Sequence, residues 1–148
     1  MRNRDGFTLI EILIVITIIG IALGVAYNGV RSSSVKGGVR SAMDAVMTLH
    51  AVAKQSAIQR GRSAMLVVNS TTGRVWVISR KASGSGYDTV GNVENLAGRF
   101  GVTLRSTRDT FTFTPRGLGN DASGATIIIA KQDFADTITV AATGRIVR

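Results

Sequence analysis

The sequence has no cysteine, a single histidine and a single proline. Without cysteine the chain can form neither a disulfide framework nor a thiolate metal site, so packing must stabilise it. One histidine, His50, is too few for a Ser-His-Asp triad or a multi-histidine metal cluster. We therefore expect a protein that is not an enzyme and that has no cofactor, no metal centre and no small-molecule substrate. His50 itself is expected to be a helix-surface or partly packed residue.

Two patterns that bind ligands in other proteins are incomplete here. Gly84-Ser85-Gly86 and Gly117-Leu118-Gly119 lack the lysine and the following helix of a phosphate-binding loop, so we interpret them as turns. Asp133 and Asp136 flank Phe134 in an expected loop. A calcium site is conceivable there, but turn-forming aspartates are favoured.

The first thirty residues are the most distinctive part of the chain. A short basic leader, residues 1–6, precedes the 21 residues from Phe7 to Tyr27, which carry one formal charge, that of Glu11. This segment is long enough to cross a hydrocarbon core of roughly 30 Å and is longer than the apolar part of an ordinary secretory signal. We expect residues 7–30 to be retained as a transmembrane helix.

Glu11 needs a partner, because an ionised carboxylate in hydrocarbon costs about 2.5–3.5 kcal/mol. Gly6 is a small residue at which a peptidase could cut. Removal of the leader would leave Phe7 with a free amine one helical turn before Glu11, where the two charges can neutralise each other. In the alternative interpretation, a plain signal anchor keeps its leader, and Glu11 lies in the headgroup region.

Gly6-Phe7-Thr8-Leu9-Ile10-Glu11, followed by the aliphatic residues 12–16, resembles the class III signal of type IV pilins and type II secretion pseudopilins. The resemblance implies that a prepilin peptidase cuts after Gly6 and methylates the Phe7 amine. It also implies that Glu11 pairs with the amine of a neighbouring subunit during filament assembly. The leader would lie in the cytoplasm and the rest beyond the bacterial inner membrane, in the periplasm. Basic residues flank the segment on both sides, so the positive-inside tendency does not decide the orientation.

The region after the membrane segment predicts an amphipathic stalk helix over residues 31–62. Its apolar residues recur every three or four positions: Val35, Val39, Ala42, Val46, Leu49, Ala53 and Ala57. Gly37 and Gly38 are expected to loosen or bend the helix, since each glycine costs about 1 kcal/mol relative to alanine. Many type IV pilins carry a proline in the second half of the hydrophobic helix, which this chain lacks. Arg60-Gly61-Arg62 predicts the end of the helix.

Residues 63–148 predict a β-rich domain. Short strand patterns alternate with turn residues, and a hairpin is expected around Ser70-Thr71-Thr72-Gly73. The predicted strands are residues 64–69, 74–79, 101–105, 110–114, 125–130, 137–142 and 146–147, whereas residues 88–99 show no clear pattern. The expected fold is α+β and pilin-like, with a long N-terminal helix packed on a mostly antiparallel sheet.

Two short motifs in the second half, Phe111–Gly117 and Thr143-Gly144-Arg145, together with the Trp76 strand, resemble the H-type pseudopilin and FimT minor pilin family. This resemblance implies a minor subunit that assembles with other pilins in a filament. A type II secretion pseudopilus is the favoured filament. A type IV pilus is the alternative.

The chain is basic, with a net charge of +9, which becomes +8 if the leader with Arg2, Arg4 and Asp5 is removed. Such a surplus favours polyanions or anionic lipid heads. Some FimT-like pilins bind DNA through a C-terminal glycine-arginine motif, so a DNA-binding pilin is a second hypothesis. Its contacts would come from basic residues expected along one edge of the sheet: Arg116, Lys131, Arg145 and Arg148. The favoured interpretation of these residues is an ordinary solvated edge whose charges prevent aggregation.

Overall fold

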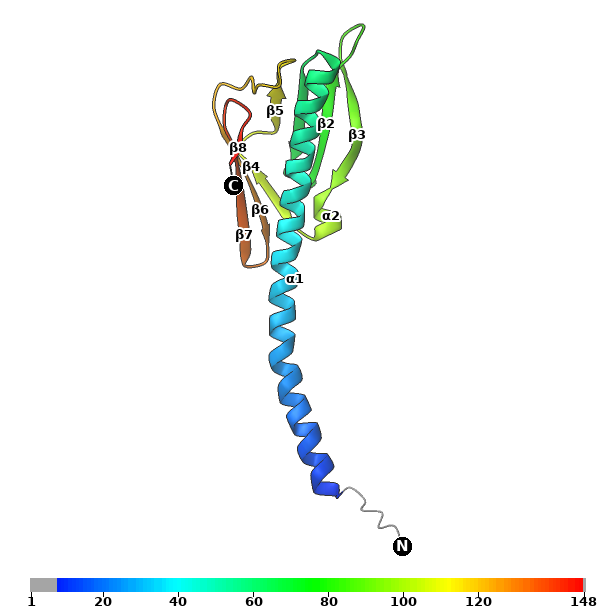
Figure 1. Cartoon of the computed structure of the whole chain (residues 1–148), viewed down its shortest axis with the longest axis vertical. Coiled ribbons are helices and arrows are strands. Elements are labelled where there is room, and N and C mark those ends of the chain that lie inside the picture. The colour runs from blue at the N-terminus through cyan, green and yellow to red at the C-terminus, as the bar shows by residue number, and fades with distance from the viewer. Residues whose placement is uncertain (1–7, 148) are drawn as a thin grey trace. The chain divides into compact units, whose positions relative to one another are not determined.

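A computed structural model describes residues 8–147, the side chain of Asn28 excepted. The chain divides into two compact units, residues 1–34 and 35–148. The first helix, α1, runs from Leu9 to Arg60 without interruption. Strands and one short helix make up the remainder of the second unit (Figure 1). The α+β class predicted from the sequence, with a long N-terminal helix followed by antiparallel strands, is confirmed.

Helix α1 ends where the sequence predicts. Gly61 adopts a left-handed conformation with φ 60°. Its N–H donates to the Ile58 carbonyl at 3.2 Å, and the Arg62 N–H donates to the Ala57 carbonyl at 3.2 Å. This pair of hydrogen bonds is a Schellman motif, which satisfies carbonyl groups left open at a helix C-terminus.

Helix α1 continues through Gly37 and Gly38, the two residues expected to loosen or bend it. Packing explains Gly38. A Cβ atom on Gly38 would lie 3.0 Å from the Lys131 Nζ and 3.2 Å from the Phe100 carbonyl oxygen, whereas one on Gly37 would meet nothing within 4 Å. Gly38 therefore permits a close approach between α1 and the β-rich domain.

The β-rich domain contains two antiparallel four-stranded sheets. The first has the order β3-β2-β1-β5 and the second has the order β4-β6-β7-β8. The strands of the first sheet are β1 (Ala64–Asn69), β2 (Arg74–Arg80), β3 (Tyr87–Asn95) and β5 (Thr110–Phe113). Those of the second are β4 (Thr103–Ser106), β6 (Ala125–Lys131), β7 (Phe134–Val140) and β8 (Ile146–Val147). A short helix, α2 (Leu96–Phe100), connects β3 to β4.

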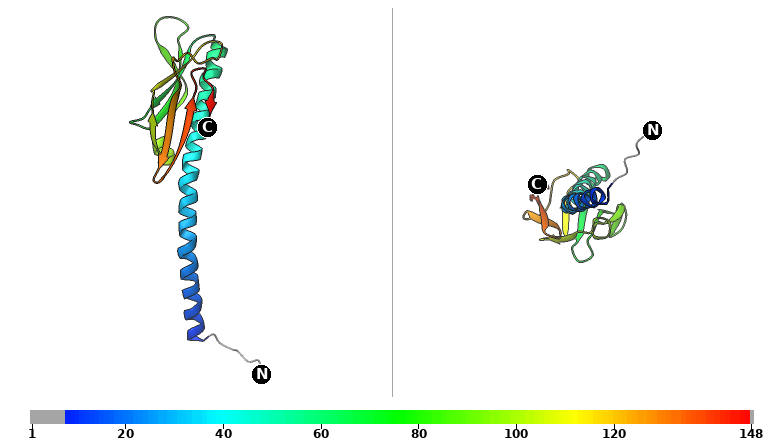
Figure 2. Two further views of the ribbon diagram at one scale, coloured as in Figure 1. Left: turned by 90° about the vertical axis from the view of Figure 1, so that its left-hand side faces the viewer. Right: turned by 90° about the horizontal axis from the view of Figure 1, so that it is seen from below.

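The core lies between the domain part of α1 and the inner faces of the strands, which Figure 2 shows on one side of the helix. Alternate residues of β1 and β2 are buried, as expected for strands with one face on a core. Helix α1 contributes buried residues at helical spacing: Val39, Ala42, Met43, Val46, Ala53 and Ala57. Sequence periodicity had already indicated most of these positions.

Candidate functional site

Glu11 lies in the first turn of helix α1, where local interactions favour an acidic residue. The Thr8 hydroxyl accepts a hydrogen bond from the Glu11 backbone N–H at 3.3 Å. Thr8 is thus the N-cap and Glu11 the third helical residue, which is the residue spacing of a capping box. A negative charge in the first turn is also favoured by the helix dipole. Gly6 and Phe7, the predicted cleavage and methylation residues, lie outside the described residues.

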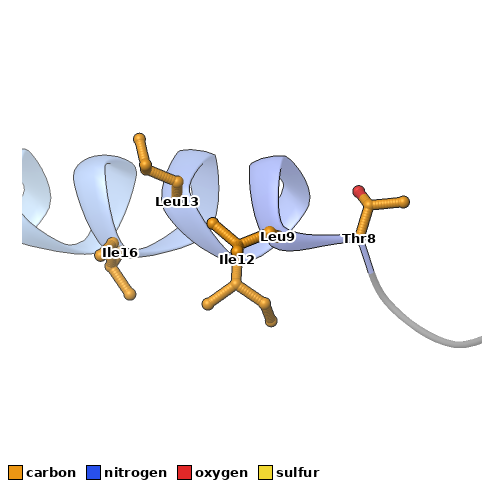
Figure 3. A pocket seen from close by; sticks show the side chains of 5 residues that line it. All are labelled: Thr8, Leu9, Ile12, Leu13 and Ile16. Atoms are coloured by element: carbon orange, nitrogen blue, oxygen red, sulfur yellow. The ribbon is translucent and has the colours of Figure 1, made fainter.

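The first turns of helix α1 have an apolar, exposed surface. A shallow groove on this surface has a volume of about 420 Å³. Its lining side chains, which Figure 3 shows, are Thr8, Leu9, Ile12, Leu13 and Ile16. Large hydrophobic side chains between Leu9 and Val30 are exposed by 45 % to 82 %. The most apolar window of the helix has a mean hydropathy of 2.8, and α1 is the one helix within residues 8–147 that is long and apolar enough to cross a membrane. So large an exposed apolar surface requires lipid or other helices to cover it.

Three of the basic residues proposed to contact DNA lie in the described part of the chain, and they do not share one sheet edge as expected. Lys131 ends β6, an inner strand of its sheet, and its Nζ donates to the Phe100 carbonyl at 2.7 Å. This bond satisfies a carbonyl at the end of α2, beside Gly38. The Lys131 ammonium thus has a structural partner within the fold.

Arg116 and Arg145 are exposed at other places in the domain. Arg116 belongs to the loop after β5, where Gly117 packs against Ile58 of α1. Arg145 directly precedes β8, the edge strand of the second sheet. Lys131 lies beside Gly38, and Arg116 lies next to Gly117, which packs on Ile58. Gly38 and Ile58 are twenty residues apart on α1, so at about 1.5 Å per residue these two contact points are roughly 30 Å apart along the helix. Arg148 lies outside the described residues.

His50 is more buried than predicted, with 7 % of its surface exposed. Its ring meets Phe113 edge to face, with 4.9 Å between the ring centroids. The pKa of His50 is lower than its usual 6.5, mainly because burial disfavours the charged ring. A hydrogen bond with the Gly144 backbone raises the pKa, and the positive charge of Lys54 lowers it. His50 therefore links α1 to β5 and to the turn before β8. The sequence carried a signal for this, because His50 is four residues after Val46 and three before Ala53, on the buried side of the helix.

We predict that the domain loses stability as the pH falls from 7 to 5. The pKa of His50 is lower in the folded state than its usual 6.5. As the pH falls, the unfolded chain therefore takes up a proton at His50 more readily than the folded chain, which favours unfolding. The free energy of unfolding, measured by denaturant titration of the full chain in detergent micelles, should decrease over this range. The His50→Gln variant should show a flatter pH dependence. Equal slopes in the two proteins would contradict the prediction.

The two aspartates considered for a calcium site, Asp133 and Asp136, lie in a turn and in a strand. Asp133 lies in the two-residue turn between β6 and β7, whereas Asp136 lies in strand β7 and not in the expected loop. The Asp136 carboxylate accepts a hydrogen bond from the Thr137 N–H at 2.8 Å. Residues 8–147 contain no group of three or more His, Cys, Asp or Glu side chains that could hold a metal ion.

Two family models match the chain. A model described as a prokaryotic N-terminal methylation motif matches residues 1–27. A model described as type II transport protein GspH matches residues 42–144. No curated protein gave a match.

Solved structures of minor pilins and pseudopilins have a similar fold. The type IV minor pilin FimU of Pseudomonas aeruginosa strain PAO1 is 18 % identical, with 76 % of this chain and 88 % of that chain covered and a TM-score of 0.60. The minor pseudopilin EpsH of the Vibrio cholerae type II secretion system is 16 % identical, with 72 % and 91 % covered and a TM-score of 0.56.

Proposed function

Because this chain belongs to the type II transport protein GspH family, we propose that it is a minor pseudopilin of a type II secretion pseudopilus. It would support protein secretion by assembly and would catalyse no reaction. The observation that carries the proposal is the order of two features in one chain. A methylation motif over residues 1–27 precedes a GspH domain over residues 42–144.

The proposed assembly begins in the inner membrane, with the C-terminal domain in the periplasm. A prepilin peptidase removes residues 1–6 and methylates the amine of Phe7. The exposed apolar half of α1 then leaves the lipid and packs against equivalent helices of other subunits. Lipid and neighbouring helices cover the same apolar surface of α1, so the move from one to the other changes the hydrophobic free energy little. A charged group is needed to define the position of one helix against the next.

Glu11 is proposed to supply that charge. Its carboxylate would pair with the methylated amine of a neighbouring subunit, which removes the cost of an isolated charge in an apolar filament core. The pairing is directional, since each subunit has one such amine and one such carboxylate. The position of Glu11 in the first turn of α1 supports this role, because the carboxylate is held near the end of the helix where the amine is expected.

The processing step tests the proposal most directly. We expect Gly6→Val to block cleavage, because the larger side chain would not fit the peptidase, and to abolish release of exported proteins in a strain that lacks the native gene. Mass spectrometry of the purified chain gives the cleavage state, and assay of culture supernatants gives secretion. Asp5→Asn, a change inside the leader that keeps Gly6, should be cleaved and should restore secretion. A native wild-type chain with an intact, unmethylated start would instead indicate a plain signal anchor.

The same strains separate secretion from DNA capture. If the chain is a secretion pseudopilin, loss of the gene reduces protein release and leaves uptake of DNA unchanged. DNA binding would show as salt-dependent retention of duplex DNA by the wild-type chain that Arg145→Ala and Arg148→Ala both weaken. Such retention, combined with normal secretion in the deletion strain, would favour a type IV minor pilin that binds DNA.

A further inference from the structure

The single tryptophan of the chain, Trp76, lies on the outer face of the first sheet. Its neighbours Val75 and Val77 are buried in the core, whereas Trp76 is partly exposed and pairs with Val67 of β1 across the sheet. An indole ring is the largest apolar group available to a core, and here the core does not use it. Tryptophan is enriched at surfaces that bind other molecules.

The neighbouring strand makes room beside this tryptophan. Strand β3 pairs Glu94 with Val75 and Val90 with Val77, so three residues of β3, 91–93, lie opposite Trp76 alone. Gly91 in this bulge has φ 74°, a conformation that other residues rarely adopt. Val93, in the same bulge, is 50 % exposed. Bulges of this kind bend an edge strand and are frequent next to binding sites.

Two shallow pockets adjoin Trp76, and Asn69 borders both. One has a volume of about 290 Å³ and is also lined by Thr72, Arg74 and Val93. The other has a volume of about 190 Å³ and is bordered by Ser70 and Asp109. Both volumes lie below the range of drug-sized sites. Each pocket therefore suits one small ring.

Polar groups around Trp76 lack partners in the fold. The Ser70 hydroxyl is buried without a hydrogen bond to any described residue. Within residues 8–147 the Asp109 carboxylate and the Arg74 guanidinium take part in no side-chain hydrogen bond or ion pair. The Asn69 side-chain oxygen accepts from the Thr72 N–H at 2.9 Å, which leaves its NH₂ group as a donor. A carboxylate, an amide and a guanidinium thus border the two pockets beside the Trp76 ring.

We infer that Trp76 and these polar groups form a binding site for a glycan, with a sugar ring against the indole. A sugar ring has an apolar C–H face that can pack on an aromatic ring, and hydroxyls at its edge that both donate and accept hydrogen bonds. Asp109 offers acceptors for those hydroxyls, and Arg74 and Asn69 offer donors. A nucleic acid fits less well, because the Asp109 carboxylate would repel its phosphates. An apolar peptide would leave the polar groups without partners.

The site can be tested with triacetylchitotriose, a neutral oligosaccharide, added to the full chain in vesicles of phosphatidylcholine, since many detergents carry sugar headgroups. Trp76 is the only tryptophan, so its fluorescence reports on the site without background. We expect a saturable change in emission. Asp109→Asn should weaken the apparent affinity about tenfold, because hydrogen bonds to a charged group are strong. Asp88→Asn, which alters a carboxylate paired with Lys81 at 3.7 Å, should bind like the wild type.

Three results would overturn the inference. The first is no saturable response of the wild-type chain to the oligosaccharide. The second is an unchanged affinity in Asp109→Asn, with circular dichroism showing that the variant is folded. The third is a tighter response to single-stranded oligothymidylate than to the oligosaccharide, which would identify the surface as a stacking site for nucleic acid. None of these results depends on whether the chain assembles into a pseudopilus.

Discussion

A chain with Glu11→Ala is expected to insert into the membrane at the wild-type level but to enter filaments at least about tenfold less often. Insertion does not need the carboxylate, since the rest of the segment is apolar and a charge only opposes transfer into lipid. Incorporation needs it, because loss of one partner leaves the amine of the adjacent subunit as an unpaired charge in an apolar core, a change that costs several kcal/mol. Fractionation of membranes and quantification of the subunit in sheared filaments measure the two steps.

A second variant separates pairing from an effect on the helix start, because Glu11 is also the third helical residue after the N-cap Thr8. Glutamine can fill that position in a capping box, but it carries no charge. If pairing with the amine is the role of Glu11, then Glu11→Gln should fail to assemble as completely as Glu11→Ala. Normal incorporation of Glu11→Gln would show that the residue acts through the helix start and would refute the pairing. The Thr8 cap was not identified from the sequence, although the T-x-x-E spacing of Thr8 and Glu11 is its sequence signal.

The strands that the sequence predicted best are those with one face on the core. In β1 the buried and partly exposed residues alternate without exception, because β2 and β5 flank it on both sides and the helix covers one face. Such a strand shows its period directly in the sequence. The hairpin to β2 was predictable for the same reason, together with the turn residues Ser70 to Gly73.

Residues 88–99 gave no pattern, and the structure shows why. Strand β3 is an edge strand in which nearly every residue is exposed, so it has no buried face to produce an alternation. Helix α2 has five residues, fewer than two turns, so no helical period can develop. It is defined by its ends, where the Asn95 side chain accepts from the Gly98 N–H at 2.9 Å and Gly101 takes φ 64°.

The positions of the basic residues depended on contacts that sequence spacing does not reveal. Lys131 reaches the carbonyl of Phe100, thirty-one residues earlier in the chain. Arg116 is placed by the packing of Gly117 on Ile58, which joins the loop after β5 to the end of α1. A prediction from sequence could count these charges, but their grouping required the two sheets to be assembled around the helix.

Gly119→Ala is expected to lower the melting temperature of the full chain by at least about 5 °C. The Gly119 N–H donates to the Thr143 carbonyl at 2.8 Å, so two backbones meet there directly. An added Cβ atom would collide with the Ala142 carbonyl oxygen and the Gly144 nitrogen, which are main-chain atoms and cannot rotate away. Overpacking of this kind typically costs about 1–3 kcal/mol. Thermal unfolding followed by circular dichroism in detergent micelles gives the melting temperature.

Gly37→Ala is the matched control, since an added Cβ atom there meets nothing within 4 Å and alanine favours helix. That variant should melt at or slightly above the wild-type temperature. The damage in Gly119→Ala should also be local at first, because β8 has two residues and pairs with β7 alone. Limited proteolysis should therefore cut the variant within residues 141–147 at temperatures where the wild type resists. Wild-type melting together with wild-type protease resistance would show that the turn before β8 moves aside without cost, and that the Gly119 contact does not hold the C-terminal strand.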